Sequence, residues 1–218
     1  MKKCIIFDLD ETLGYFTQIY VLCCKFTEIT SNSLSSTDLF YMFSEFPNIF
    51  RPGIFTLLAY INLLKIKYDV KVVLYTNSLM SITWIQTIID YINKKINPQT
   101  KFFDHYITLD MKCRKNVKKS IDEVYNCCSN LSRDYKYFIV DNKKFHSITD
   151  NVEFKLINTY IYTYHNKHMW NWLLRKKQIQ NIPGIVDNNI DEKVNYSICD
   201  KATKDVIDLF NDIGNFII

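Results

Sequence analysis

Two carboxylates at alternate positions follow a short apolar run near the start of the chain. Residues 4–7, Cys-Ile-Ile-Phe, are too few for a buried helix and are typical of a buried parallel strand. Asp8 and Asp10 come directly after this run. Ligands of open α/β sheets bind at the carboxyl ends of the strands, so Asp8 should end the strand and Asp10 should curl back over the same pocket. Because a solvated turn can also carry two acids, the pair alone does not define a site.

Polar side chains follow two further apolar runs in the same way. Lys71–Tyr75 is a predicted strand that ends in Thr76-Asn77-Ser78, and residues 137–140 are another that ends in Asp141-Asn142. A basic run, residues 112–119, lies between them in the sequence. Since the carboxyl ends of parallel strands meet at one edge of a sheet, these groups should converge with Asp8 and Asp10.

Phosphoryl transfer explains why such residue types would meet. A carboxylate that attacks a phosphate approaches a group carrying about two negative charges, and each charge pair at ~4 Å repels by roughly 4 kcal/mol at an effective dielectric constant near 20. Cations must offset this repulsion. A Mg²⁺ ion held by oxygen ligands, together with one lysine ammonium, would do so.

These residue types suggest a division of roles. Asp8 would attack phosphorus and form an aspartyl-phosphate. Asp10 would protonate the leaving oxygen and later take a proton from the hydrolysing water. The Thr76 hydroxyl and nearby backbone amides would bind the phosphate oxygens. Mg²⁺ would be held by Asp8, the backbone carbonyl of Asp10 and Asn142, with Asp141 either ligating directly or supporting the ligands.

The remaining pattern predicts the fold. Strands at 102–108 and 152–157 join the three above, and helical spacing of apolar residues at 54–64 and 79–96 separates them. Strands that alternate with helices indicate a Rossmann-like α/β domain with a parallel sheet and helices on both faces. Residues 14–50 form a predicted flap or insertion rich in β-structure. Toward the end of this segment we expect a short helix with Thr37 or Asp38 as its N-cap. Residues 159–218 form a predicted helical extension without an assigned role.

Several motifs together resemble one superfamily. Asp8-Leu9-Asp10-Glu11-Thr12-Leu13, Arg51-Pro52-Gly53, Tyr75-Thr76-Asn77-Ser78-Leu79 and Val140-Asp141-Asn142 occur in the order found in haloacid dehalogenase (HAD) phosphatases. The chain resembles most the branch that acts on the C-terminal domain of RNA polymerase II, also called NLI-interacting-factor-like phosphatases. This resemblance implies Mg²⁺-dependent hydrolysis of phosphoserine or phosphothreonine in a protein, for example the polymerase C-terminal domain.

The resemblance also implies site residues. Val117-Lys118 is similar to a family Val-Lys-Asp, which makes Lys118 the expected phosphate-facing lysine, with Lys115 and Lys119 as alternatives. Lys143-Lys144 stands where the family usually has Ser-Pro, and two extra cations could favour more anionic substrates. The full expected set is Asp8, Asp10, Thr76 and Lys118 for catalysis, Thr12, Arg51, Asn77 and Ser78 for substrate binding, and Asp8, Asp10, Asp141 and Asn142 for the metal.

Bulk properties narrow the class of protein. The chain has 218 residues, a net charge of +4, 48% hydrophobic and 23% charged residues, which is ordinary for a globular domain. The mild charge makes nucleic acid an unfavoured partner without excluding it. The sequence predicts neither a signal peptide nor a membrane span, hence an intracellular, cytoplasmic or nuclear protein. The seven cysteines are expected to be small buried hydrophobic residues in a reducing compartment.

Two other functions remain open at this stage. One is a phosphatase that acts on the 3′ ends of nucleic acids or on small molecules. The other is a phosphopeptide-binding module without turnover, although such modules tend to lose a motif carboxylate and both are present here. Residues 14–50 look too short and too strand-like for a large helical cap, which favours a macromolecular substrate.

Overall fold

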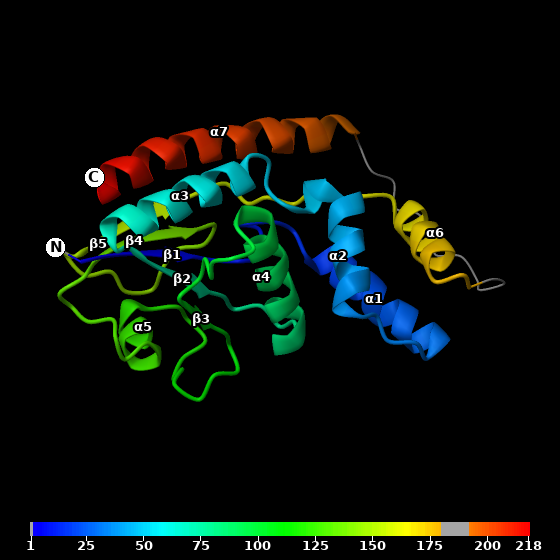
Figure 1. The fold of residues 1–218 in the computed structure, drawn as a ribbon, viewed down its shortest axis with the longest axis horizontal. Helices are drawn as coiled ribbons and strands as arrows, with labels where there is room; N and C mark the ends of the chain where they lie inside the picture. Colours follow the sequence, from blue (N-terminus) through cyan, green and yellow to red (C-terminus); the bar gives the residue numbers. More distant parts are fainter. Residues whose placement is uncertain (1, 180–191) are drawn as a thin grey trace.

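A parallel sheet forms the centre of the molecule, with all strands directed toward one edge (Figure 1). The computed structural model describes residues 2–179 and 192–218. The strand order is β3-β2-β1-β4-β5, so the first strand lies in the middle, paired with β2 and β4. The predicted α/β fold with a parallel sheet is confirmed. The strands are β1 (Lys3–Phe7), β2 (Lys71–Tyr75), β3 (His105–Ile107), β4 (Lys136–Asp141) and β5 (Val152–Leu156).

Both faces of the sheet are buried, which explains why its strands read as nearly continuous apolar runs. Successive side chains of a strand point to opposite faces. Ile5 and Phe7 of β1 therefore belong to one apolar core, and Cys4 and Ile6 belong to a second core on the other side. Burial on two sides fixes the register of β1 and hence the position of the residues that follow it.

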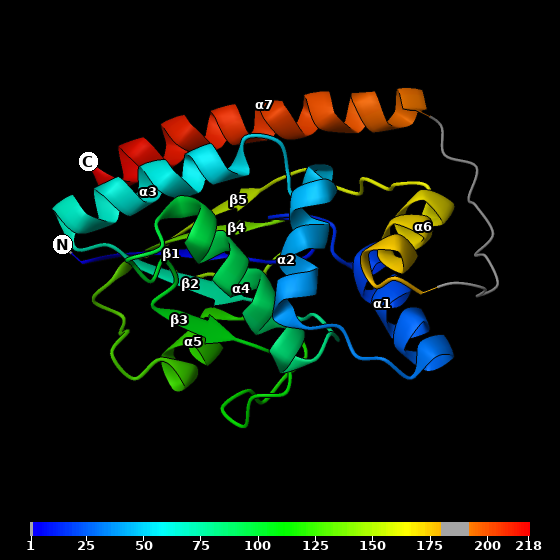
Figure 2. The same ribbon diagram turned by 45° about the vertical axis from the view of Figure 1, so that its right-hand side comes forward.

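Helices cover the two faces unequally (Figures 1 and 2). The first face carries α3 (Ile54–Tyr68), α4 (Ile82–Ile96) and α7 (Glu192–Ile217), and α7 lies along α3. The second face carries the short α5 (Ile121–Cys127). Helix α4 begins later than the predicted residue 79, because the Ser81 side chain caps it by accepting a hydrogen bond from the Trp84 backbone.

Residues 14–50 are helical, which corrects the predicted β-rich flap. They contain α1 (Thr17–Thr30), α2 (Ser36–Glu45) and a short 3₁₀ turn, η1 (Pro47–Ile49). Helix α6 (Asn166–Lys176) packs against α1 at one end of the sheet, where the Phe26 and Trp170 rings lie 5.9 Å apart (Figure 2). We call α1, α2 and α6 the helical lobe.

The period of α1 was present in the sequence but obscured. Its buried residues are Ile19, Leu22, Cys23 and Phe26, which recur at helical spacing. Other apolar residues of α1 are exposed, and together they gave the stretch the composition of a strand. The N-cap of α2 is Ser35, in a reciprocal capping box with Asp38, and neither Thr37 nor Asp38 is the cap.

One cysteine pair departs from the expectation of free thiols. Cys113 and Cys127 form a disulfide with their Cα atoms 5.2 Å apart. Cys4, Cys23 and Cys128 are free and buried, as small hydrophobic residues would be. The disulfide joins the basic run before α5 to the end of α5, so it closes a local loop.

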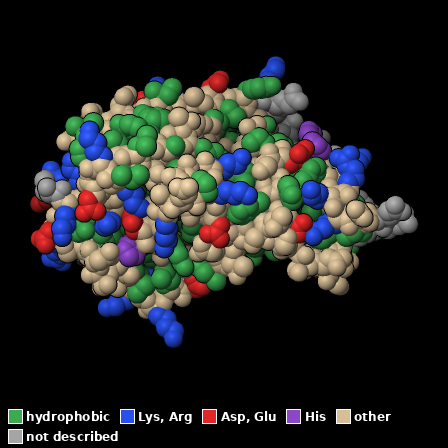
Figure 3. Space-filling view, in the orientation of Figure 1, with side chains coloured by type: hydrophobic (Ala, Val, Ile, Leu, Met, Phe, Trp, Pro, Cys, Tyr) green, Lys and Arg blue, Asp and Glu red, His purple; other side chains and the backbone are tan. Residues whose placement is uncertain are grey.

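The described residues contain no helix that is long and apolar enough to cross a membrane. On the face drawn in Figure 3, lysine and arginine side chains are interspersed with acidic and apolar ones over the described residues and form no continuous basic stripe.

Candidate active site

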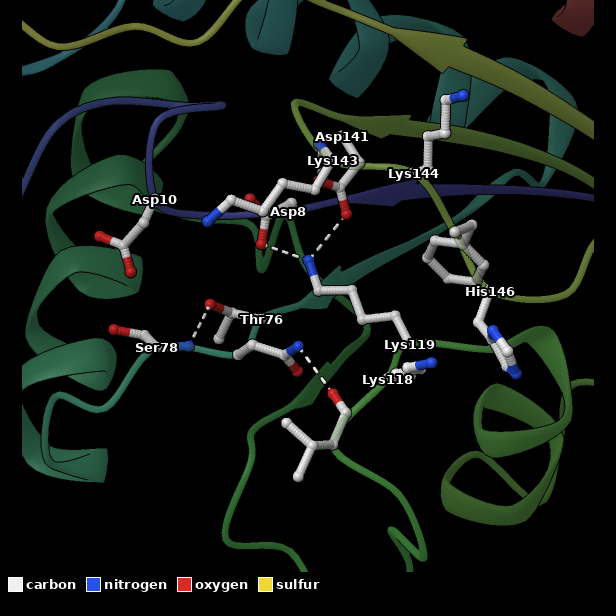
Figure 4. A pocket seen from close by; sticks show the side chains of 13 residues that line it. Asp8, Asp10, Thr76, Ser78, Lys118, Lys119, Asp141, Lys143, Lys144 and His146 are labelled. Atoms are coloured by element: carbon white, nitrogen blue, oxygen red, sulfur yellow. Dashed lines mark hydrogen bonds and ion pairs between the residues drawn. The ribbon is translucent and has the colours of Figure 1, made fainter.

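A cavity of about 530 Å³ lies at the carboxyl ends of β1, β2 and β4 (Figure 4). Its position follows from the topology, because three adjacent parallel strands end there. Seven of the residues predicted from the sequence line this cavity, and Thr12, Arg51 and Asn142 do not; the seven are Asp8, Asp10, Thr76, Asn77, Ser78, Lys118 and Asp141. The complete lining is Asp8, Asp10, Thr76, Asn77, Ser78, Val117, Lys118, Lys119, Asp141, Lys143, Lys144, Phe145 and His146.

The Lys119 ammonium lies between two carboxylates (Figure 4). It donates to Asp8 Oδ1 and, over 2.8 Å, to Asp141 Oδ2. The side chains of all three residues are at least nine-tenths buried. Burial raises the pKa of Asp141, and the negative charge of Asp8 raises it further. A single cation thus compensates two buried carboxylates at neighbouring strand ends.

The lysine that contacts the carboxylates is one of the two alternatives to Lys118. Lys118 was expected to face the phosphate, with Lys115 and Lys119 as alternatives. The structure places Lys119 on the carboxylates, while Lys118 is exposed on the cavity wall. The similarity of Val117-Lys118 to the family motif was not enough to choose among three lysines within five positions. Sequence similarity does not show where the loop contacts the sheet.

Asp10 lies on the opposite side of Asp8 from Lys119 (Figure 4). Burial raises the pKa of Asp10 from 3.8 to about 6, the nearby charge of Asp8 adds to the rise, and a hydrogen bond from the Ser78 side chain opposes it. Its Oδ1 atom is buried and has no hydrogen-bond partner among the described residues. Glu11, the next residue, has a positive φ of 64°, which turns the chain back toward the sheet after Asp10.

Three predicted residues follow β2 at the cavity. The Thr76 hydroxyl accepts a hydrogen bond of 3.0 Å from the Ser78 backbone and can still donate its own hydrogen to a phosphate. The Asn77 amide is engaged in holding a neighbouring loop, since it donates to the Val117 carbonyl and accepts from Arg114. Asn77 therefore lines the cavity with its amide already engaged by the lysine-bearing loop.

Thr12 and Asn142 face each other rather than the cavity. Thr12 is buried, and its hydroxyl contacts Asp8 Oδ2 at 3.0 Å and Asn142 Oδ1 at 3.3 Å. The Asn142 amide also donates to the Glu11 side chain at 2.8 Å. Thr12 thus positions Asp8 instead of binding substrate, and the Asn142 side chain is not among the cavity-lining groups that could hold a metal.

Arg51 is buried away from the cavity, which corrects its predicted role in substrate binding. Its guanidinium donates to the backbone carbonyls of Glu11 at 2.8 Å and Thr12 at 2.6 Å. It also pairs with Asp205 of α7 at 2.9 Å and donates to the Asn158 carbonyl. Arg51 therefore fixes the backbone of residues 8–14, which we call the signature loop.

The sequence reading missed Glu123 of α5. Its buried carboxylate pairs with Arg114 at 3.1 Å and accepts hydrogen bonds from the Lys115 and Asn116 backbones and from the Tyr75 hydroxyl. These partners belong to residues 112–119, the lysine loop, and to β2. Glu123 thus shapes the segment that carries Lys119, and nothing in its sequence context distinguishes it from an ordinary acid in the first turn of a helix.

Two carboxylates could hold a metal at this site. Asp8 and Asp141 supply hard oxygen donors and already share one cation, Lys119. Mg²⁺ is commonly bound by one or two carboxylates, with substrate phosphate and water as the other ligands, so this donor set fits it. The described residues contain no group of three or more His, Cys, Asp or Glu that could hold a metal.

Comparison with protein-family models and with curated proteins finds no match. Among solved structures, the HAD domain of effector protein Lem4 from Legionella pneumophila is similar, with a TM-score of 0.38 and 11% identity over 94% of this chain and 97% of that chain. An inactive mutant of that domain has the same TM-score and 12% identity over the same shares. These values are too low to assign a family.

Proposed function

We propose that this chain is a phosphatase of the haloacid dehalogenase type that forms an aspartyl-phosphate on Asp8. The observation that carries the proposal is the convergence of Asp8, Asp141 and Lys119 in one cavity with Asp10 and Thr76. A cation beside the attacking carboxylate offsets its repulsion from a phosphate. A buried carboxyl with a pKa of about 6 is suited to proton transfer near neutral pH.

The reaction has two steps. In the first, an Asp8 oxygen attacks phosphorus, the bond from phosphorus to the ester oxygen breaks, and protonated Asp10 gives its proton to the leaving oxygen. In the second, water attacks the phosphorus of the aspartyl-phosphate, the bond from phosphorus to the Asp8 oxygen breaks, and Asp10 takes a proton from the attacking water. Inorganic phosphate then leaves, and Asp8 is again a free carboxylate. Thr76 holds the phosphate oxygens in both steps.

The proposal includes Mg²⁺, which Asp8 and Asp141 would hold together with the backbone carbonyl of Asp10. When bound, the ion supplies positive charge to the phosphate oxygens. The chain's own contribution is to keep the two carboxylates close together in a buried setting, which Thr12 does for Asp8. The Lys143 backbone does the same for Asp141, to which it donates at 2.7 Å.

For the substrate, we propose phosphoserine or phosphothreonine in a protein or peptide, as in the polymerase C-terminal-domain branch. The support is the open access to the cavity: no described residue of the helical lobe lines it. The sequence reading expected an open site because residues 14–50 resembled strands. They are helical, and the lobe lies beyond one end of the sheet (Figure 2), yet none of its described residues is among those that line the cavity.

Hydrolysis of an aryl phosphate tests the phosphatase proposal. We expect Mg²⁺-dependent turnover by the native chain and none by Asp8→Asn. Lys119→Gln should lower kcat by about 10² to 10³, the usual effect of removing one group that stabilises transition-state charge. Lys115→Gln is the matched control, because its side chain is exposed in the same loop and lines no part of the cavity. Full activity in Asp8→Asn would contradict the proposal.

A further inference from the structure

Four cationic or cation-forming side chains line the cavity beyond Lys119. They are Lys118 of the lysine loop and Lys143, Lys144 and His146, which follow β4. We call them the cationic wall. Lys118, Lys144 and His146 lie on the side of Lys119 away from Asp10, and Lys143 extends across the cavity from the end of β4 toward Asp10 (Figure 4).

The wall is attached to the catalytic groups through the backbone. The Lys143 backbone donates to Asp141 Oδ1 at 2.7 Å, and the His146 backbone donates to the Lys119 carbonyl at 3.0 Å. Phe145, between them, is buried and packs edge-on against Tyr75 of β2. The positions of the wall residues are therefore set by the same strand ends that position the carboxylates.

Among the described residues, no carboxylate forms an ion pair with a side chain of the wall. Within residues 2–179 and 192–218, the side chains of the four wall residues have no ion pair or hydrogen bond, whereas Lys119 has two acidic partners. All four are exposed. Three aspartates and four lysines line the cavity, and Lys119 already serves two of those aspartates. A concentration of unpaired positive charge beside a phosphate site attracts further negative charge.

We propose that the cationic wall binds a second phosphoryl group on a peptide substrate, next to the phosphoryl group that reacts at Asp8. The inference rests on the proposed function and names its substrate class: a doubly phosphorylated peptide. Lys119, Thr76 and the carboxylates serve the reacting group, so the wall remains for the second one. A cavity of about 530 Å³, lined by no described residue of the helical lobe, leaves room for both.

The lining favours a peptide over a nucleotide. A base needs an exposed aromatic face on which to stack. The only apolar side chains among the lining residues are Val117 and Phe145, and Phe145 is just 7% exposed. Val117 is 69% exposed on the lysine loop, where it can contact an apolar side chain of a peptide.

Binding to the Asp8→Asn variant tests the wall without turnover. The probes are one serine-containing peptide with a single phosphoserine and a set in which a second phosphoserine is placed one, two or three residues away. We expect at least one doubly phosphorylated peptide to bind about tenfold more tightly at low salt, as two or three exposed charge pairs would provide. The preference should weaken when salt shortens the Debye length to below about 10 Å.

The double variant Lys143→Gln, Lys144→Gln in the Asp8→Asn background assigns the effect to the wall. Its preference for two phosphates should fall severalfold, whereas Lys101→Gln with Lys136→Gln, two exposed lysines outside the cavity, should retain it. An equal affinity for singly and doubly phosphorylated peptides at every spacing would overturn the proposal. So would a preference that survives in the double variant, or stronger competition by a nucleoside bisphosphate than by the peptides.

The same peptides separate the two proposals when hydrolysis by the native chain is measured. If the singly phosphorylated peptide is hydrolysed with no preference for the doubly phosphorylated ones, the phosphatase proposal is supported and the proposed second phosphoryl site is contradicted. If doubly phosphorylated peptides bind more tightly but none is hydrolysed, the proposed second phosphoryl site is supported and the phosphatase proposal is contradicted.

Discussion

Two of the loops that line the cavity are held in different ways. The signature loop, with Asp8 and Asp10, is fixed by Arg51, whose guanidinium has a side-chain exposure of 0% and also reaches Asp205 of α7, 154 residues away in sequence. The lysine loop, with Lys119, is shaped by Glu123, which is only four residues further along the chain. The backbone of the signature loop therefore depends on contacts distant in sequence, while that of the lysine loop is organised mainly by a nearby residue.

This difference predicts that substitutions in the signature loop destabilise the domain, whereas surface substitutions in the lysine loop are tolerated. Residues of the signature loop are mostly buried, and their partners lie far apart in sequence, so a change there should disturb the whole domain. Much of the lysine loop is exposed, and the Cys113–Cys127 disulfide closes it locally. The lysine loop can therefore vary at its surface without moving the sheet. The predictions below test this contrast.

Arg51→Ala should have the largest effect on stability. It leaves the Asp205 carboxylate and three backbone carbonyls without their buried donor. Breaking such a buried pair costs about 3 to 5 kcal/mol, which urea unfolding followed by circular dichroism would measure. Arg133→Ala is the control, since its side chain is 83% exposed and should change stability by less than about 0.5 kcal/mol. A decrease in the free energy of unfolding of less than about 1 kcal/mol for Arg51→Ala would show that the domain does not depend on the contacts of Arg51.

Glu123→Gln should have a smaller effect on stability, because three of the four partners of its carboxylate lie in the adjacent lysine loop and only Tyr75 of β2 is distant in sequence. Hydrogen bonds to a charged group contribute about 1.5 to 3 kcal/mol, and the variant keeps the shape of the side chain. Hydrogen bonds and Arg114 outweigh burial and lower the pKa of Glu123 in the folded chain, so its contribution is present above the ordinary pKa of 4.5 and is lost as pH falls.

The control for Glu123 is Asp122→Asn, whose side chain is 63% exposed. Unfolding at pH 7 and at pH 4 should show a destabilisation by Glu123→Gln that shrinks in acid, and almost no change for the control. An equal loss at both pH values would mean that the charge of Glu123 does not organise the lysine loop.

Asp10→Asn should change stability the least of the three variants, and it should stabilise the chain where the other two destabilise it. Below pH 3.8 the Asp10 carboxyl is neutral in the folded and unfolded chains, and above about pH 6 it is ionised in both. The buried charge then destabilises the fold, so stability is lost as pH rises through about 6. Without Mg²⁺, the variant should be more stable than the native chain by about 1 to 3 kcal/mol at pH 8 and equal to it near pH 3.5. A variant that is less stable at pH 8 would contradict this account.

The central part of the fold could be predicted because its signals are local. Apolar runs such as residues 71–75 have few alternatives to a buried strand, and the polar residues after them mark the edge where strands end. Asp8, Asp10, Thr76 and Asp141 could be brought together on that basis alone. No long-range contact had to be known, because the carboxyl ends of parallel strands lie at the same edge of a sheet.

What sequence reasoning missed depends on long-range contacts. Arg51 looks the same in the sequence whether its partner is a phosphate or Asp205, and only the packing of α7 on α3 decides. Lys119 differs from Lys118 by one position in a loop whose path Glu123 sets. Helix α1 was predicted as β-structure because exposed apolar residues such as Val21 hid its helical period, whereas a short helix was expected where α2 lies.

The most direct test of the account is to trap the phosphorylated enzyme. The native chain is mixed with a phosphopeptide and Mg²⁺, quenched in acid within one turnover, digested and analysed by mass spectrometry. The account predicts one phosphoryl group on Asp8, in the peptide that follows Lys3, and none in Asp8→Asn. Turnover of the phosphopeptide with no covalent phosphoryl group, or with one attached to a residue other than Asp8, would contradict it.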